Sequence, residues 1–219
     1  MSKTLLLLAI AYFFCTTTVH SQSTIDSLLV EELEQLGKID QFAAVNAQPP
    51  EGYKQLSQEQ WEAKKDSIYR ANQKRAAEIL DEFGFPGYDL VGQKGSTNFW
   101  ATVQHADFDP VFQQKVLEVM YHEVKKDNAS NRLYALLTDR VNKNTGKLLV
   151  YGTQVDYNFF TGKAYPLPTI DPDNLNQRRA EVGLEPIEAY LADMTNTFLE
   201  RSPTVLGLTI PGLIVILAK

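Results

Sequence analysis

The hydrophobic period of this 219-residue chain changes near residue 147. Before that point apolar residues recur at steps of three and four, as at Leu29 and Leu33, which is the spacing of an amphipathic helix. After it, the segment 148–157 is rich in β-forming residues, and the residues from 157 to 162 suit a hairpin loop. The sequence therefore predicts the α+β class, as a mainly helical single domain with a small antiparallel β-hairpin.

Capping signals mark where several of the expected helices begin. The run from Ser57 to Gln60 fits a capping box, and Asp109 before Pro110 fits an N-cap followed by a proline in the first turn. The segment 92–95 predicts a turn. Together with the periodicity, these signals predict helices over 23–41, 57–83, 97–106, 110–126, 131–141 and 186–199, a further helix around 178–179, and extended segments over 148–157 and 164–170.

The two ends of the chain differ from its middle. Lys3, the apolar run to Cys15 and the small residues up to Ser21 indicate a secretory signal peptide, and hence a secreted or periplasmic protein. An uncleaved anchor is the alternative. The uncharged segment 204–218 is too short for a ~30 Å hydrocarbon core. We therefore expect it to form a buried strand pair or to pack on the domain or a neighbouring chain, with membrane contact as the alternative. The expected parts are a signal peptide (1–21), a helical N-terminal arm (22–83), an α+β core (84–200) and an apolar C-terminal tail (201–219).

Composition excludes several kinds of chemistry. Cys15 is the only cysteine and lies in the signal peptide, so the mature chain has no disulfide, thiolate nucleophile or cysteine-ligated zinc. A formal net charge of −6 argues against nucleic acid as a partner, because phosphate binding needs a basic face. The sequence contains no P-loop, dinucleotide glycine fingerprint, HExxH or GxSxG motif, so we expect no cofactor.

Four short polar blocks stand beside strongly apolar runs, at 104–107, 138–140, 151–154 and 178–179. Polar groups in apolar surroundings are costly unless they bond one another or take part in chemistry, so these blocks are the best candidates for a site. His105 suits a general acid or base, oriented by Asp107 or Asp139. The catalytic candidates are His105, Asp107, Asp139 and Arg140, and the binding candidates are Gln104, Gln154, Arg178 and Arg179.

Each block also has a structural interpretation. His105 at a helix end suits a cap or a satisfied core group, and Asp139 with Arg140 suits a pair that ties a helix to the hairpin. Gln154 could close a buried amide network, and Arg178 and Arg179 could be one structural and one exposed side chain. The pattern His105-x-Asp107-x-Asp109 could hold a metal ion, but Asp109 has a simpler role as an N-cap, so we assign no metal site.

The polar blocks occur in a fixed order with other short motifs. This ordered set resembles an uncharacterised bacterial family that is catalogued as a domain of unknown function, and the match runs from about Leu80 to Tyr190. The resemblance implies a bacterial origin, and it implies no activity, cofactor or catalytic residue. The set comprises Phe85-Pro86-Gly87, Val91-Gly92, Gln104-His105-Ala106-Asp107, Phe112-Gln113, Leu137-Thr138-Asp139-Arg140-Val141, Tyr151-Gly152-Thr153-Gln154, Arg178-Arg179 and Val182-Gly183-Leu184.

Three functional hypotheses follow from the sequence. The first is a binding or interaction module of the cell envelope, with an unknown small polar or anionic ligand and a polar cluster that specifies the fold. The second is a hydrolase-type enzyme in which His105 transfers protons while Arg140, with Arg178 or Arg179, holds an anionic group. The third treats the polar blocks as purely structural. A common open pocket for these side chains would favour the enzyme, and a sealed network would favour a structural role.

Overall fold

The computed structural model describes residues 25–158 and 160–201, so the predicted signal peptide and the apolar segment 204–218 lie outside the described residues. The described chain is mainly helical and contains one two-stranded antiparallel sheet, which confirms the predicted fold class. Its elements are α1 (Ser27–Val45), α2 (Gln58–Phe83), α3 (Tyr88–Gln104), α4 (Pro110–Val124), α5 (Asn131–Asn144), β1 (Val155–Tyr157), β2 (Ala164–Pro166), the 3₁₀ turn η1 (Pro172–Asn174), α6 (Leu175–Glu181) and α7 (Ile187–Arg201).

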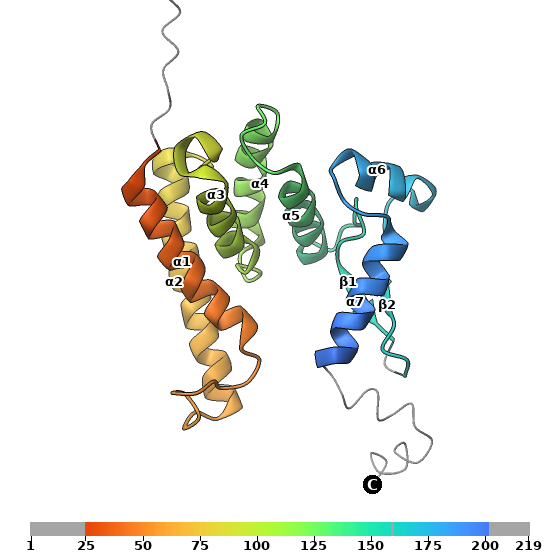
Figure 1. Ribbon diagram of the computed structural model, residues 1–219, viewed down its shortest axis with the longest axis horizontal. Helices are drawn as coiled ribbons and strands as arrows, with labels where there is room; N and C mark the ends of the chain where they lie inside the picture. The colour runs from red at the N-terminus through yellow and green to blue at the C-terminus, as the bar shows by residue number, and fades with distance from the viewer. Residues whose placement is uncertain (1–24, 159, 202–219) are drawn as a thin grey trace, which may run out of the picture.

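The first five helices share one apolar core. Each contributes a side chain with no solvent exposure: Leu33, Ile79, Phe99, Val116 and Leu137, in the order of the helices. These residues occupy the apolar stripe that the three- and four-residue spacing predicts. Figure 1 shows α1 and α2 side by side along one edge, with α3 and α4 between them and α5. The core therefore spans the predicted arm and the beginning of the predicted α+β core.

Two of the predicted helix starts are confirmed in atomic detail. The Ser57 hydroxyl accepts a hydrogen bond from the backbone N–H of Gln60, and the Gln60 amide oxygen accepts one from the backbone N–H of Ser57. The Asp109 carboxylate accepts a hydrogen bond from the Phe112 N–H, with Pro110 as the first residue of α4. Both helices begin where the side chains satisfy otherwise free backbone N–H groups.

Helix α3 begins earlier than the sequence predicts. It starts at Tyr88 rather than near residue 97, and the expected turn is a kink at Gly92, where φ is 67°. The reason lies in a distant segment. Asn128, in the loop between α4 and α5, accepts hydrogen bonds from the backbone N–H groups of Tyr88 and Asp89. This capping across about forty residues of sequence has no local signal.

The hairpin is shorter than the two extended segments that the sequence predicts. Strand β1 pairs with β2 in the register Val155 to Pro166 and Tyr157 to Ala164. The residues just before β1 make no ladder, because Asp139 accepts hydrogen bonds from the N–H groups of Val150, Tyr151 and Thr153. The predicted strand 148–157 is therefore mostly an irregular loop, joined to the segment after β2 by a single bridge between Leu149 and Thr169.

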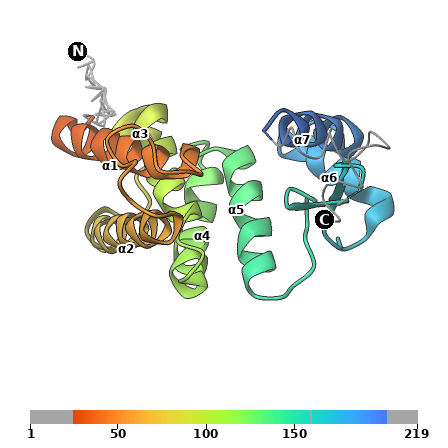
Figure 2. The same cartoon turned by 90° about the horizontal axis from the view of Figure 1, so that it is seen from below.

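Helix α5 is the last helix of the helical region (α1 to α5) and borders the C-terminal region, which comprises the loop before β1, the hairpin, α6 and α7. In Figure 2 the helices α1 to α4 lie on one side of α5, and the hairpin with α6 and α7 lies on the other. Helix α7 packs on β2, and α6 packs on α7. Among the described residues, no helix is both long enough and apolar enough to cross a membrane.

Candidate functional site

Asp107 is the centre of a polar network between α3, α4 and α5. Its two oxygens each accept a hydrogen bond of 2.8 Å from Arg140, one from Nε and one from Nη2. The amides of Asn144 and Gln113 donate to the same carboxylate at 2.8 and 3.3 Å. Burial raises the pKa of Asp107, but the bonds and charge of Arg140, with the two amides, outweigh burial and hold that pKa below its usual value.

Gln113 links the Asp107 network to the backbone of α3 through its side-chain amide. Its buried amide donates to the carbonyl oxygens of Val103 and Gln104 at the end of α3, and its own oxygen accepts from Asn144. The Gln104 carbonyl oxygen lies in the last turn of α3, where the helix supplies no further N–H, and Gln113 gives it a donor. The Val103 carbonyl oxygen also accepts the backbone N–H of Ala106. Arg140 therefore has a fixed position, held by a carboxylate that is itself fixed.

His105 belongs to a different cluster. It follows the last residue of α3, and its Nδ1 lies 2.7 Å from Oδ2 of Asp40, a residue of α1 with no solvent exposure. The imidazole ring packs on Tyr69 of α2, with ring centroids 5.3 Å apart. Burial and the charges of Asp40 and Glu62 raise the pKa of the Tyr69 phenol. The expected partners of His105, Asp107 and Asp139, accept other donors.

Asp139 anchors the loop that leads into β1. The carboxylate has no solvent exposure and accepts hydrogen bonds from the N–H groups of Val150, Tyr151 and Thr153, at 2.7, 3.1 and 2.8 Å. It also accepts one from the Thr153 hydroxyl at 3.0 Å. Asp139 and Arg140 do not pair with each other, since successive helix residues point to different faces. Asp139 binds the C-terminal region and Arg140 binds the helical region.

Arg178 and Arg179 both bind backbone carbonyl oxygens. Arg178 donates to Val150 at 2.9 Å and to Ile170 at 2.6 Å. Arg179 has no solvent exposure and donates to Tyr151 at 2.6 Å and to Glu185 at 2.7 Å. Burial lowers the pKa of the Arg179 guanidinium. These arginines hold the loop 150–153 against α6, so neither is arranged as a substrate clamp.

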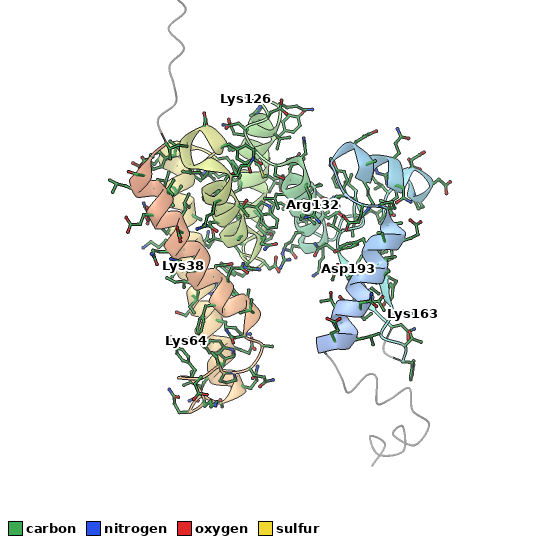
Figure 3. All side chains as sticks on the ribbon, in the orientation of Figure 1. Lys38, Lys64, Lys126, Arg132, Lys163 and Asp193 are labelled. Carbon is green, nitrogen blue, oxygen red and sulfur yellow. The ribbon has the colours of Figure 1, made fainter. Side chains whose placement is uncertain are left out.

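Figure 3 shows how the charged side chains of the two regions are distributed. Lys38 and Lys64 lie on α1 and α2, and Asp193 lies on α7. Arg132 lies on α5 beside the C-terminal region, where its guanidinium is 3.8 Å from the Glu185 carboxylate. This long contact between two half-exposed groups is a weak link compared with the buried bonds of Asp139 and Arg179.

A pocket of about 360 Å³ opens where the helical region meets the C-terminal region. Its polar lining consists of Gln104 from the end of α3, Arg140 from α5, and Thr153 and Gln154 from the loop before β1. The Gln104 side chain has no hydrogen-bond partner among the described residues, and the Gln154 amide makes only a long contact of 3.4 Å to the Thr153 carbonyl oxygen. Both amides are therefore available to a bound molecule.

The rest of the pocket wall is apolar or aromatic. It is formed by Leu136, Val155, Tyr157, Tyr190 and Met194. Tyr190 is held on one side by the Arg179 guanidinium, 4.9 Å from its ring centre, while its hydroxyl donates to the Thr153 carbonyl oxygen. Tyr157 stacks on Phe198 with centroids 4.1 Å apart. Both tyrosine rings are thus fixed before any ligand arrives.

The structure brings three of the eight candidate residues to one pocket: Gln104, Arg140 and Gln154. Asp107 pairs with Arg140 but is not part of the described lining. Backbone groups are the partners of Asp139, Arg178 and Arg179. His105 lies in the cluster with Asp40. In the stretches of the chain that the structure describes, no three acidic, histidine or cysteine side chains are grouped so that they could hold a metal ion.

Several residues of these clusters were not among the sequence candidates. Asp40 had a signal, because it continues the buried stripe of Leu29 and Leu33 at helical spacing and is an acid where an apolar residue is expected. Gln113 stands directly after Phe112 in one of the ordered family motifs. Tyr190 and Met194 are four residues apart on one face of α7, but nothing local says what that face covers.

The fold and the site define a helical α+β domain with a small, preformed polar pocket beside its hairpin. The model of a family of unknown function, DUF6624, matches residues 43–200 of the chain. This protein therefore belongs to the DUF6624 family, in agreement with the resemblance drawn from the ordered motifs. It matches no curated protein and no solved structure.

Proposed function

We propose that this chain is a binding module of the cell envelope and that the pocket between its helical and C-terminal regions takes a small polar or anionic molecule. The observation that carries the proposal is the convergence of Gln104, Arg140 and Gln154 on one opening. These residues come from three elements far apart in sequence. A concave site with apolar walls and a few placed polar groups is typical of small-molecule binding.

Binding is favoured over catalysis because the pocket lacks a group that transfers protons near neutral pH. Arg140 is the only charged side chain of the described lining, and its guanidinium is a hydrogen-bond donor without an acceptor. The imidazole of His105 is bound to Asp40 and does not belong to the described lining. The amides can hold and orient a ligand without reacting with it.

The cell-envelope location in this proposal rests on the N-terminal sequence. Lys3, the apolar run that follows and the small residues before Ser21 have the pattern of a secretory signal peptide. Fractionation of cells that express the full chain tests the location separately. We expect a shortened product outside the cytoplasm. A full-length product in the cytosolic fraction would contradict export but would leave the pocket proposal unaffected.

A fragment and metabolite screen by protein NMR, which includes muropeptides, tests the pocket on the mature chain. We expect hits whose chemical-shift changes centre on Gln104, Thr153 and Gln154. The variant Met194→Trp, which fills the pocket, should abolish them, while the exposed variant Gln177→Leu on α6 should not. Hits that survive Met194→Trp, or the absence of any hit, would overturn the proposal.

A hydrolase-type enzyme is the second candidate, because the Asp40–His105 pair has the geometry of an acid/base group with its orienting carboxylate. In that case chromogenic ester, amide, phosphate or glycoside substrates are turned over by the mature chain. His105→Asn, whose amide can still donate to the buried Asp40 carboxylate, abolishes the turnover with little loss of melting temperature, and His122→Asn serves as the control. A fall of many degrees in melting temperature with no activity in either protein would contradict this candidate.

A further inference from the structure

The pocket offers more hydrogen-bond acceptors than an anion can use. Gln104 and Gln154 each bring an amide oxygen as well as an NH₂ group to the same opening. An amide oxygen accepts hydrogen bonds, but a carboxylate has no donor to offer, and inorganic phosphate at neutral pH keeps only one or two P–OH groups among its four oxygens. A ligand that satisfies both ends of both amides must itself carry donors and acceptors side by side.

The charge at the pocket is already balanced. Among the described residues of its lining, Arg140 is the only charged one, and both oxygens of Asp107 lie 2.8 Å from its guanidinium. No described residue accepts a hydrogen bond from Nη1 of Arg140, so this nitrogen remains available as a donor. It is available within a neutral ion pair, which attracts an anion far less than a free arginine does.

The walls favour a ring with an apolar face. Tyr157 and Tyr190 are held by Phe198 and Arg179, and Leu136 and Met194 add aliphatic surface. A volume of about 360 Å³ is at the lower end of the range for small-molecule sites. It suits one or two small rings rather than an extended chain.

From these three observations we infer that the pocket binds an uncharged, hydroxyl-rich ring molecule, of which a simple sugar is the type. Hydroxyl groups are donors and acceptors at once, so they satisfy the Gln104 and Gln154 amides and the free Nη1 of Arg140 together. The C–H face of the ring packs on the tyrosines. This inference rests on the proposed function and narrows its ligand from polar or anionic to polar and uncharged.

Titration of the mature chain with glucose, N-acetylglucosamine, glucuronate and inorganic phosphate, followed by NMR, tests the inference. We expect the two uncharged sugars to shift pocket resonances with little change in affinity between low and high salt. Gln154→Leu should weaken the binding about tenfold, which corresponds to the loss of one good hydrogen-bond group. The matched variant Gln177→Leu should leave it unchanged.

Two results would overturn the inference. If only glucuronate and phosphate shift the pocket resonances, with strong salt dependence, the ligand is an anion and the proposed binding function stands without the sugar. If none of the four probes shifts them while the wider fragment screen finds pocket hits, the ligand chemistry is different again. The binding function itself is contradicted if that screen gives no pocket hit, or if its hits survive Met194→Trp.

Discussion

The five N-terminal helices and the C-terminal segment 148–201 are stabilised by different kinds of interaction. The helices bury Leu33, Phe99 and Val116 completely in one apolar cluster. Among its described residues, the C-terminal segment buries fewer apolar side chains, such as Leu149 and Leu175, and it also buries the whole Arg179 side chain. Across the junction, Asp139 of α5 holds the loop through backbone N–H groups.

This contrast explains how a pocket can form at such a junction. Apolar packing makes the helical region rigid by itself, whereas charge-assisted hydrogen bonds hold the C-terminal region in a single position against it. The pocket takes Gln104 and Arg140 from the helical region and Gln154 from the C-terminal region. Its shape therefore depends on the polar contacts that hold the junction.

The largest effect is expected from the apolar core. Phe99→Ala should lower the free energy of unfolding by about 3–5 kcal/mol, because it removes a fully buried ring and leaves a cavity. Chemical denaturation measures the change, and amide exchange should speed up across α1 to α5. Phe83→Ala, at a side chain that is 37% exposed, is the control and should cost much less.

Asp139→Ala should cost about 3–4 kcal/mol, and its effect should be local. It leaves the N–H groups of Val150, Tyr151 and Thr153 without their acceptor, and these are partly or fully buried. Amide exchange should accelerate from residue 148 onward while α1 to α4 stay protected. Asp66→Ala, which removes an exposed carboxylate on α2, is the control. Equal loss of protection in all helices would show that the two regions unfold as one unit.

The smallest effect is expected at Asp107. Its pKa is lowered in the folded protein, so its stabilising contribution is present above the unfolded-state pKa and is lost as the pH falls through the folded-state value. Asp107→Asn should cost less than about 1 kcal/mol at neutral pH, since the pair is partly exposed, and should flatten the loss of stability below pH 4. Melting curves between pH 2 and pH 7 measure this. A difference in melting temperature between the variant and the unmodified protein that is the same at every pH would contradict a lowered pKa for Asp107.

Local rules predicted the fold class and much of the helix pattern. The capping box at Ser57 and the N-cap at Asp109 lie where those rules place them. The rules failed where a distant residue supplied the hydrogen bonds. Asn128 extends α3 back to Tyr88, and Asp139 takes the N–H groups that the predicted strand would have used.

The sequence predicted which residue types form the candidate site, but it did not predict which of these residues contact one another. Sequence could select Gln104, Arg140 and Gln154, because polar side chains beside apolar runs must find hydrogen-bond partners or take part in a site. Their convergence, and the assignment of His105 to Asp40, could not be read from the chain, because Asp40 and His105 are 65 positions apart.

The order of the amino acids is enough to specify the helices, the place of the hairpin and which polar groups must be satisfied, because periodicity and capping act within a few residues. The partners that satisfy those groups are selected by the packing of whole helices, on which hydrogen-bond geometry depends. That packing leaves the Gln104 and Gln154 amides at an open pocket and places Asp139 and Arg179 in sealed contacts.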